Sequence, residues 1–521
     1  MDNLQGDVKM KINYADKFRE DLKEFREATK KFYNKEMTVN EYKGISGAFG
    51  SYAQRGAESS MLRLRLCGGR LTQDYLKFIV ESVEKYKIDL IHLTTCQSVQ
   101  LHNLSGDVVC SLVEEAWDHG FITRGGGGDF PRNVMVTPLT GVEKNEYFNM
   151  TPYAEIASDY LLSFIKEVKL PRKLKVCFSS TPKNWPHATF RDLGFVAKEN
   201  GKFDVYCAGG LGPNPKLGVC VAEDVEPTKI LYYVKAMINT FIAHGNYEQR
   251  ARARTRYMQD TLGVDGLKKA YQEKLQEVMD NEDLDIDVPV LEYTKTGSDV
   301  NFTDARVIAQ KQPGLYAVSY HPIGGNLSPE KLHKIYDTMS KMDQVEIRLT
   351  PNEGLFFINC TADEAKTLMA LTDDGAKTQF EKSVACIGAS ICQVGLRDSQ
   401  GLLESCVNAV RPYNFADGVL PIIRISGCPS SCSAHQIGAL SFRGAGKKTE
   451  EGLASAFAVF EGGSDYQGHE HFASDVGVML TEDIPKFLIE LGQTISDAST
   501  TYDKWIVEHH DEFLEIAKKY C

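Results

Sequence analysis

The sequence of 521 residues predicts an α+β fold made of two similar halves that are related by pseudo-twofold symmetry. Two stretches of 42 residues, 62–103 and 318–359, share ten identical residues at a constant offset of 256 without a gap. Composition alone would give roughly two or three matches. A weaker similarity relates 170–180 to 420–430 at an offset of 250. A chain of this length is also too long for one hydrophobic core, so we expect a duplicated, multidomain protein.

Each copy of the repeat has the pattern of an α/β half-module. An alternating apolar run leads to a Gly-Gly pair, at 68–69 in the first copy and 324–325 in the second. Thr72 and Ser328 then predict the N-cap of a helix of about 14 residues with apolar positions near i, i+3 and i+7. A single alternating strand is expected to close each unit, over 91–102 and 347–357. Each copy is therefore predicted to form strand–helix–strand.

The segments outside the repeats have helical patterns. Residues 1–45 and 480–521 are expected to be helical at the two ends of the chain. The segment 246–280 is rich in Arg and Lys and predicts a helical insertion in the first half.

The bulk composition excludes several classes of protein. Hydrophobic residues make up 42% and charged residues 25%, which is ordinary for a globular protein. The net charge of −12 argues against nucleic acid as the main partner. The first 20 residues contain no apolar signal region, and no apolar run is long enough for a membrane span. We therefore expect a cytoplasmic protein.

Four of the 13 cysteines form a distinctive pattern. Cys386 and Cys392 are spaced C-x5-C, and Cys428 and Cys432 follow 35 residues later as C-x3-C. Four thiolates from two loops of small residues can hold a 4Fe–4S cluster, in which each iron takes one ligand. A structural Zn(Cys)4 site would suit the second spacing but not the first, and four unrelated thiols are the other alternative. Cys406 lies between the pairs in a helical pattern and is interpreted as a packing residue.

The order C-x5-C…GCPxxC resembles the haemoprotein of the sulfite and nitrite reductases, which couples a 4Fe–4S cluster to sirohaem. The resemblance extends over nearly the whole chain. It implies duplicated ferredoxin-like half-modules plus two sirohaem/cluster-binding α/β domains. It also implies that Cys386, Cys392, Cys428 and Cys432 bind the cluster, and that Cys432 bridges it to the sirohaem iron.

This resemblance divides the chain into five expected segments. They are an N-terminal helical segment (1–45), a first ferredoxin-like repeat half (46–125), a first sirohaem- and substrate-binding domain with the helical insertion (126–300), a second ferredoxin-like repeat half (301–375), and a 4Fe–4S and sirohaem-binding domain with C-terminal helices (376–521).

The resemblance further implies that Arg63, Arg132, Lys173 and Lys175 surround the distal face of the sirohaem and bind the substrate. Sirohaem carries eight carboxylates and the substrate is an anion, so such a pocket needs Arg and Lys. Any one of these cations could instead be a solvated surface charge. However, Arg63 and Arg65 are expected to share one face of a strand, as are the two lysines, and two charges on an interior face need a shared anionic partner.

Other residues are candidates for binding the macrocycle. The strand TTCQSVQLHN offers Gln97, Gln100 and His102 as hydrogen-bond donors, although His102 could equally be a satisfied core histidine. Arg65 and Asn133 lie in motifs similar to those of the family. Gly209 and Gly210 follow a strand-like run and could direct backbone amides to carboxylates, whereas no G-K-[ST] follows them as a phosphate loop would require.

The sequence departs from the family pattern at two places. Cys96 stands where the family usually has arginine, which removes one expected contact to a sirohaem carboxylate. Cys67 stands where proline is common. We expect His92 or the arginines of 250–256 to supply the sirohaem contact that Cys96 cannot make.

The resemblance implies the six-electron reduction of sulfite to sulfide. The pair Lys173 and Lys175 matches the K-x-K of sulfite reductases, whereas plant-type nitrite reductases tend to have asparagine at the second position; reduction of nitrite to ammonia is the alternative. No flavin or nicotinamide motif is present, so electrons are expected from a separate protein such as ferredoxin. The basic stretch 9–35 could bind an acidic donor, or could be an ordinary solvated helix. An alternative of another class is a non-catalytic electron-transfer or sensor protein, which predicts loss of the substrate cations.

Overall fold

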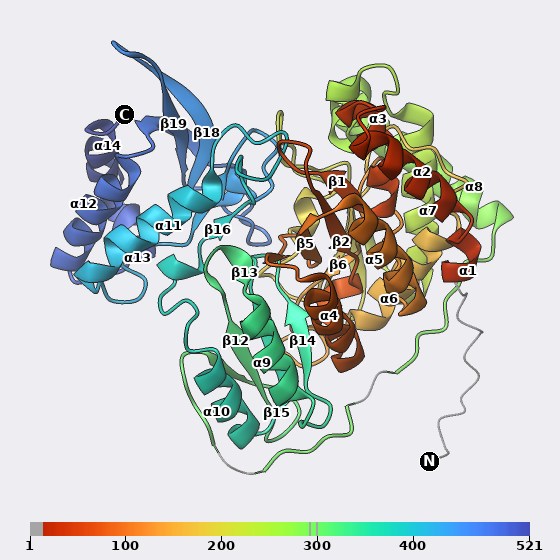
Figure 1. Ribbon diagram of the computed structural model, residues 1–521, viewed down its shortest axis with the longest axis horizontal. Coiled ribbons are helices and arrows are strands. Elements are labelled where there is room, and N and C mark those ends of the chain that lie inside the picture. The colour runs from red at the N-terminus through yellow and green to blue at the C-terminus, as the bar shows by residue number, and fades with distance from the viewer. Residues whose placement is uncertain (1–13, 291–292, 299–300) are drawn as a thin grey trace.

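The computed structural model describes residues 14–290, 293–298 and 301–521. Four five-stranded sheets organise this part of the chain, two in each half. In Figure 1 the first half runs from red to green on the right, and the second half from teal to blue on the left. The predicted α+β fold with two similar halves is therefore confirmed.

The two repeat copies fold into matching small sheets flanked by helices. The first copy contains β1 (Ser51–Ala53), β2 (Ser60–Leu64), β3 (Arg70–Leu71), α4 (Gln73–Tyr86), β4 (Ile91–Leu93), β5 (Val99–Leu104) and α5 (Gly106–Asp118). The second contains β11 (Val307–Ala309), β12 (Tyr316–Tyr320), β13 (Asn326–Leu327), α9 (Pro329–Met339), β14 (Glu346–Leu349), β15 (Leu355–Cys360) and α10 (Ala362–Leu371).

The predicted helix starts are confirmed, but the closing strand was wrong. The hydroxyls of Thr72 and Ser328 cap α4 and α9 by accepting from the amides of Tyr75 and Lys331. Where one strand was expected, the chain forms the hairpin β4–β5 in the first copy and β14–β15 in the second. The alternating pattern hid these turns, because Thr, Cys, Gln and Asn can all occupy either a strand or a turn.

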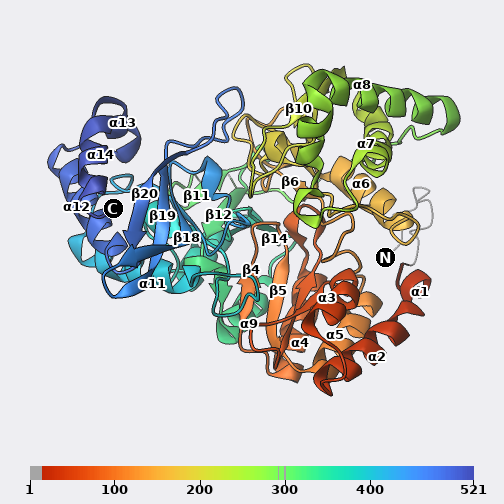
Figure 2. The same cartoon turned by 90° about the horizontal axis from the view of Figure 1, so that it is seen from above.

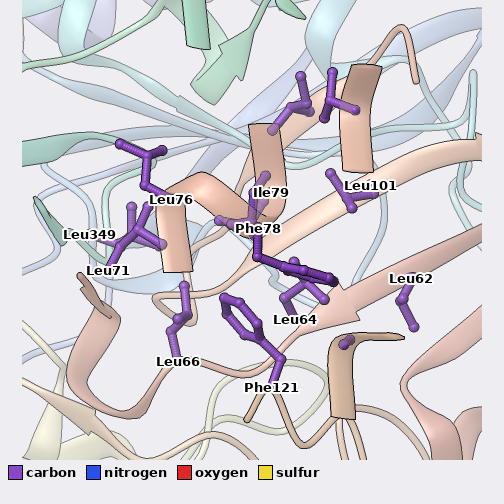
Figure 3. Close-up of a cluster of buried hydrophobic side chains, with 14 of the residues drawn as sticks. Leu62, Leu64, Leu66, Leu71, Leu76, Phe78, Ile79, Leu101, Phe121 and Leu349 are labelled. Atoms are coloured by element: carbon purple, nitrogen blue, oxygen red, sulfur yellow. The ribbon is translucent and has the colours of Figure 1, made fainter. Parts of the chain in front are cut away.

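The two small sheets exchange one short strand each. β13 of the second copy pairs with β4, and β3 of the first copy pairs with β14. The exchange places Asn326 opposite His92 and Leu71 opposite Ile347. One hydrophobic core therefore spans both copies, and Figure 3 shows Leu71 beside Leu349 within it.

Two larger sheets have the same strand order in each half. The first contains β6 (Met135–Val136), β7 (Val176–Ser179), β8 (Leu193–Ala197), β9 (Phe203–Cys207) and β10 (Val219–Val225). The second contains β16 (Val384–Ala385), β17 (Ile423–Ser426), β18 (Leu440–Thr449), β19 (Gly452–Glu461) and β20 (Ser474–Leu480). In both sheets the first three strands are parallel and the last two antiparallel.

Helices cover the sheets and the two ends of the described chain, as Figure 2 shows from above. They are α1 (Tyr14–Phe18), α2 (Asp21–Tyr33), α3 (Val39–Ser46), α6 (Thr151–Ser163), α7 (Ile230–His244), α8 (Met258–Asn281), α11 (Ser399–Val410), α12 (Ile484–Asp497), α13 (Tyr502–Glu508) and α14 (His510–Lys518). The helical prediction for both ends is confirmed from residue 14 onward, and residues 1–13 lie outside the described residues. The five segment boundaries stay a prediction.

No helix among the residues described combines the length and the hydropathy that crossing a membrane requires.

Candidate functional site

The four cysteines of the C-x5-C and C-x3-C pairs lie in loops at the same edge of one sheet. Cys386 directly follows β16, and Cys428 follows β17 after one intervening glycine. These strands are parallel and in register, with Ala385 opposite Ile425. Because the carboxyl ends of parallel strands meet at one edge, both pairs are brought together although 35 residues separate them in sequence.

The other three thiols of the set affect the pKa of Cys432. Neighbouring protein atoms and the thiols of Cys386, Cys428 and Cys392 raise this pKa, although the Cys432 side chain itself is exposed. The positive charge of Lys173 acts in the opposite direction. A cationic group bound beside Cys432 would therefore favour its thiolate form.

The chemistry of the donor set is that of an iron–sulfur cluster. Within residues 14–290, 293–298 and 301–521, no three His, Cys, Asp or Glu side chains gather closely enough to hold one metal ion. In a cubane cluster each of the four irons takes its own thiolate, so four cysteines supply the number and type of ligand that a 4Fe–4S cluster requires.

Small residues bring backbone groups close to the sulfurs. The amide of Gly427 donates to Cys386 Sγ at 3.2 Å, and the Ser399 hydroxyl lies 3.2 Å from the same sulfur. A Cβ atom on Gly427 would lie 2.5 Å from the carbonyl oxygen of Arg397, so only glycine fits. Gly388 has φ of +71° and is equally restricted.

Cys406 is separate from this group. It lies in α11, fully buried in the hydrophobic core of the second half. Burial raises the pKa of its thiol, so it is an unreactive packing residue as its helical pattern predicts.

The expected substrate cations come together on the side of the first half. Arg63 lies on β2 and donates to the carbonyl of Gly126 at 2.6 Å. Arg132 donates to the same carbonyl, and burial together with the charge of Arg63 lowers the pKa of Arg132. Gly126 belongs to a run of four glycines at 125–128. This glycine loop therefore holds two of the predicted cations side by side, because one of its carbonyls accepts from both.

Arg65 holds this loop in place. It is buried and donates to the carbonyls of Arg124 at 2.6 Å and Arg132 at 3.1 Å. β2 ends at Leu64, so Arg65 lies just beyond the strand that it was expected to share with Arg63. Burial lowers the pKa of Arg65 to about 10.

Lys173 and Lys175 lie immediately before β7, on either side of Leu174, which bridges to Pro131. Burial, Arg254 and Lys175 lower the pKa of Lys173 well below its ordinary value. Lys175 donates to Cys96 Sγ at 3.2 Å. Lys173 and Cys432 affect each other's pKa, so the cations and the cysteines form one site.

Three further groups join the site that sequence reasoning had not assigned to it. Asp192 is fully buried and accepts from Arg254 at 3.0 Å and from the amide of Lys175 at 2.8 Å. The charges of Arg191 and Arg254 both act on Lys175. The only indication of these groups in the sequence was the arginine-rich segment 250–256. Its place beside β7 depends on the tertiary fold, so the partner of each arginine could not be predicted.

The glutamines and the histidine of the TTCQSVQLHN segment do not share one strand. Gln97 lies in the turn before β5 with φ of +52°, and Gln100 and His102 lie on β5. Gln97 Nε2 donates to carbonyls of Gly68, Val136 and Leu349, so its donors are engaged within the protein. Its expected place on the strand was wrong because the turn had not been recognised.

The remaining candidates also have partners within the protein. Gln100 accepts from Arg63 Nε at 3.1 Å once its amide is oriented to suit its neighbours. His102 is buried, lies 3.2 Å from Gln54 Oε1, and has its pKa lowered to about 3 by burial. Asn133 Nδ2 donates to carbonyls of Leu66, Cys96 and Gln97, while its Oδ1 atom is buried without a partner.

The glycine loop after β9 lies near the cysteine loops. The amides of Gly209 and Gly210 donate to the carbonyls of Arg191 and Lys216, so these hydrogen bonds stay within the protein. A Cβ on Gly212 would lie 3.7 Å from the carbonyl of Ser430, between Cys428 and Cys432. Whether these glycines bind a cofactor stays a prediction.

The charge balance of the site fits a large anionic group. None of its cations except Arg254 has an ion pair with a carboxylate among the described residues, although all are partly or fully buried and cations removed from water normally require a counter-charge. The cations without a carboxylate partner are Arg63, Arg65, Arg132, Lys173, Lys175, Arg191, Arg256 and Arg424. Arg256 also has a buried Nη1 atom without a hydrogen-bond partner. Such an excess of positive charge suits a polycarboxylate together with an anionic substrate.

Models of two known protein families match parts of this chain. The family described as nitrite and sulphite reductase 4Fe-4S domain matches residues 127–279. The family described as nitrite/sulfite reductase ferredoxin-like half domain matches residues 52–116 and 308–374. The four cysteines lie outside these matched ranges.

Curated relatives span both substrates. The chain is 25% identical over 425 residues to sulfite reductase [ferredoxin] 1 of Mycolicibacterium paratuberculosis, covering 78% of this chain and 74% of that protein. It is 24% identical over 456 residues to the chloroplastic ferredoxin–nitrite reductase of Arabidopsis thaliana, covering 82% and 74%. It is 25% identical over 428 residues to the sulfite reductase [NADPH] hemoprotein beta-component of Nitrosomonas europaea, covering 74% and 72%.

The fold is also that of a solved structure. The chain superposes on the Mycobacterium tuberculosis NirA protein with a TM-score of 0.80 and 21% identity, over 96% of this chain and 95% of that one. The two ferredoxin-like half domains and their arrangement are therefore shared.

Proposed function

Because this chain belongs to the nitrite and sulfite reductase family, we propose that it catalyses the six-electron reduction of sulfite to sulfide with a sirohaem and a 4Fe–4S cluster, which Cys432 would join. The observation that carries this proposal is the junction of two groups. The charge of Lys173 lowers the pKa of the Cys432 thiol, which the rest of its surroundings raise. This coupling supports a site in which the lysine acts next to the cysteine that would join the cluster and the sirohaem.

When bound, the sirohaem and the cluster would supply the site that coordinates the substrate and the electrons. Cys386, Cys392, Cys428 and Cys432 would hold the cluster. Arg65 orients the glycine loop at 125–128, and this loop in turn holds Arg63 and Arg132. These guanidinium groups can donate to the oxygens of the bound anion in a fixed orientation.

The lysines supply a different function. The pKa of Lys173 is well below the ordinary value, because burial and the neighbouring cations disfavour its charged form. A lysine of lowered pKa can release a proton near neutral pH, and loss of sulfite oxygens as water requires protons. We therefore assign proton transfer to Lys173, and anion binding to Arg63, Arg132 and Lys175.

Sulfite is favoured over nitrite by the second lysine. Lys175 lies in the K-x-K motif, and its ammonium group adds one cation to the pocket. Sulfite has more oxygen atoms to accept hydrogen bonds than nitrite, so the additional donor supports sulfite more. One observation favours nitrite instead: Lys175 interacts with Cys96, and a thiolate at that place would neutralise its charge.

The electron donor is proposed to be a separate ferredoxin or a similar small protein. Two of the relatives above carry ferredoxin in their names, whereas the hemoprotein component from Nitrosomonas europaea is named for NADPH. Arg55 donates to the carbonyls of Cys392 and Gly395 and would lie beside the cluster at the surface.

The test is the stoichiometry of the reaction under anaerobic conditions. Purified protein is supplied with sulfite and chemically reduced viologen, and the sulfide formed is compared with the electrons consumed. The proposal expects one sulfide for every six electrons. A protein that contains cluster and haem but forms no product from either anion would support the non-catalytic alternative, and ammonia from nitrite without sulfide from sulfite would support a nitrite reductase.

A further inference from the structure

Glu353 occupies in the second half the place that Gln97 occupies in the first. The two residues are 256 positions apart, which is the offset of the repeat, and both have a positive φ in a hairpin turn (+52° and +64°). Gln97 Oε1 accepts from the amide of Val136 at 2.9 Å, and Glu353 Oε2 accepts from the amide of Ala385 at 3.0 Å. Each side chain thus holds the first strand of the neighbouring large sheet, β6 or β16.

The directions of the hydrogen bonds around Glu353 can be assigned from one carbonyl. The oxygen of Ala385 can only accept, so Gln400 donates to it through Nε2 at 2.6 Å. Gln400 Oε1 then accepts from Asn326 Nδ2 at 3.0 Å. Asn326 Oδ1 therefore faces His92 Nδ1 at 2.9 Å and requires a hydrogen on that nitrogen.

This assignment leaves a lone pair on the other nitrogen of a neutral His92. His92 Nε2 lies 3.9 Å from Glu353 Oε1. Burial lowers the pKa of His92 to about 4, so the imidazole is neutral near pH 7. The Nε2–Oε1 distance is longer than a hydrogen bond, so the contact is electrostatic: an ionised carboxylate would face a lone pair, which is repulsive, whereas a protonated carboxyl can place its hydrogen between the two atoms.

Glu353 forms no ion pair with an Arg or Lys side chain among the described residues, and only the more distant charge of Arg424 acts on it. Its side chain is 1% exposed, and burial raises its pKa well above the ordinary value, against the hydrogen bond from Ala385 and the charge of Arg424. The guanidinium of Arg424 is engaged by Ser433 O and Asn352 Oδ1. Among the described residues, three ionisable groups interact with Glu353. They are His92 on β4, Arg424 on β17 and the thiol of Cys386, which follows β16.

We propose that Glu353 is a neutral carboxylic acid that directs its proton toward His92 and positions Ala385, and through it the cluster cysteine Cys386, as the amide of Gln97 positions Val136 in the first half. Glu353 is a positioning residue and touches no substrate. The part that concerns Cys386 rests on the proposed function, whereas the protonation state of Glu353 does not.

The variant that tests this is Glu353→Gln in the full chain. Its amide can accept from Ala385 and donate to His92, as the amide of Gln97 shows is possible in this turn. Glu381→Gln is the matched control, because Glu381 is also buried in the second half but is ionised, with its pKa lowered by Arg411 and the amide of Lys377 against the effect of burial.

The first readout is infrared absorption at neutral pH. The carbonyl stretch of a protonated carboxylic acid is expected in the wild type, lost in E353Q and retained in E381Q. Absence of this band from the difference between the wild type and E353Q would overturn the proposal.

The second readout is the thermal unfolding midpoint as a function of pH. A carboxyl whose pKa is raised in the folded state contributes stability at low pH, which is lost as the pH rises toward the folded value. E353Q avoids this loss, so its folding equilibrium relative to wild type should improve by up to tenfold per pH unit above the ordinary carboxyl range. A difference that does not depend on pH, or that falls with pH, would contradict a neutral Glu353.

The third readout is iron and acid-labile sulfide per chain. E353Q should retain the wild-type content, whereas Glu353→Ala, which cannot accept from Ala385, should lose it. Equal content in E353A and wild type would overturn the positioning role. If no variant and no wild-type preparation contains a cluster, the proposed function fails, while the infrared and unfolding results still decide the protonation state.

Discussion

Lys175 Nζ lies 3.2 Å from Cys96 Sγ, so the cysteine that replaces an expected arginine is in direct contact with the lysine to which we assign the preference for sulfite. Burial alone would raise the pKa of Cys96. The charges of Lys175, Arg191 and Arg63 outweigh burial and lower this pKa to about 6. A family arginine at this place would add a positive charge, whereas a thiolate removes one.

The first prediction concerns the reactivity of Cys96. The rate of its alkylation by iodoacetamide, followed by peptide mass spectrometry, should reach half its maximum near pH 6. Lys175→Gln should move this midpoint upward toward the usual thiol value of about 8.5. Cys220 is a control in the same chain, because burial raises its pKa. A wild-type midpoint at the usual thiol value would contradict the ion pair.

The second prediction concerns substrate choice. Lys175→Asn should lower kcat/KM for sulfite by roughly ten- to a hundredfold, as expected for one charge-assisted hydrogen bond, and should affect nitrite less. Lys183→Gln is the control, because Lys183 is exposed and pairs with Glu143 away from the site. Equal losses for both substrates would mean that Lys175 does not select between them.

The third prediction concerns the cluster ligands. Replacing Cys428 by serine should abolish the visible absorption of the cluster and most of the bound iron, because each iron needs its own thiolate. Cys406→Ser should retain both the absorption and the iron, since Cys406 lies on α11 in the hydrophobic core of the second half. The added polarity should lower the stability of this variant. A C428S protein with full iron content would exclude Cys428 as a ligand.

The fourth prediction concerns the exchange between the repeat copies. Glu346 on β14 accepts from Arg348 Nε at 2.7 Å and from Arg70 Nε at 3.1 Å, so the carboxylate joins both copies. Glu346→Gln should cost roughly 3–5 kcal/mol in denaturant unfolding, because it leaves the buried guanidinium of Arg348 without its carboxylate partner. Glu330→Gln, at an exposed pair with Lys334, should change stability by less than about 1 kcal/mol.

The pH dependence of the Glu346 interaction follows from the direction in which the pKa of Glu346 is shifted. The charges of Arg348 and Arg70 outweigh burial and lower the pKa of Glu346. Its contribution is therefore present above the ordinary carboxyl pKa and is lost as the pH falls through the lowered value. The difference in unfolding free energy between wild type and E346Q should shrink on acidification, and a difference that grows would contradict the pairing.

Local patterns in the sequence predicted the repeat, the capped helices and the convergence of the two cysteine pairs. Thr72 and Ser328 could be recognised because N-caps depend on a few neighbouring residues. The cysteine pairs could be grouped from their spacing and from the family resemblance, whereas the parallel strands that precede them became evident only in the structure. These features need little knowledge of the tertiary structure.

Features that depend on distant contacts could not be predicted. The turn at Gln97 interrupts a run that alternates as a strand would, and it exists because the side chain bonds to Val136 and Leu349. Asp192 and Arg254 are 62 residues apart, and nothing local indicates their pairing. The exchange of β3 and β13 between the copies likewise depends on how the halves pack.

The measurement that tests the central claim most directly is the ratio of kcat/KM for sulfite to that for nitrite, on anaerobically purified protein with reduced viologen as the donor. We predict a ratio clearly above one, with sulfide as the product from sulfite, because Lys175 adds a cation to the pocket. A ratio below one would contradict it and would mean that the Cys96 thiolate, by neutralising Lys175, has made this protein a nitrite reductase.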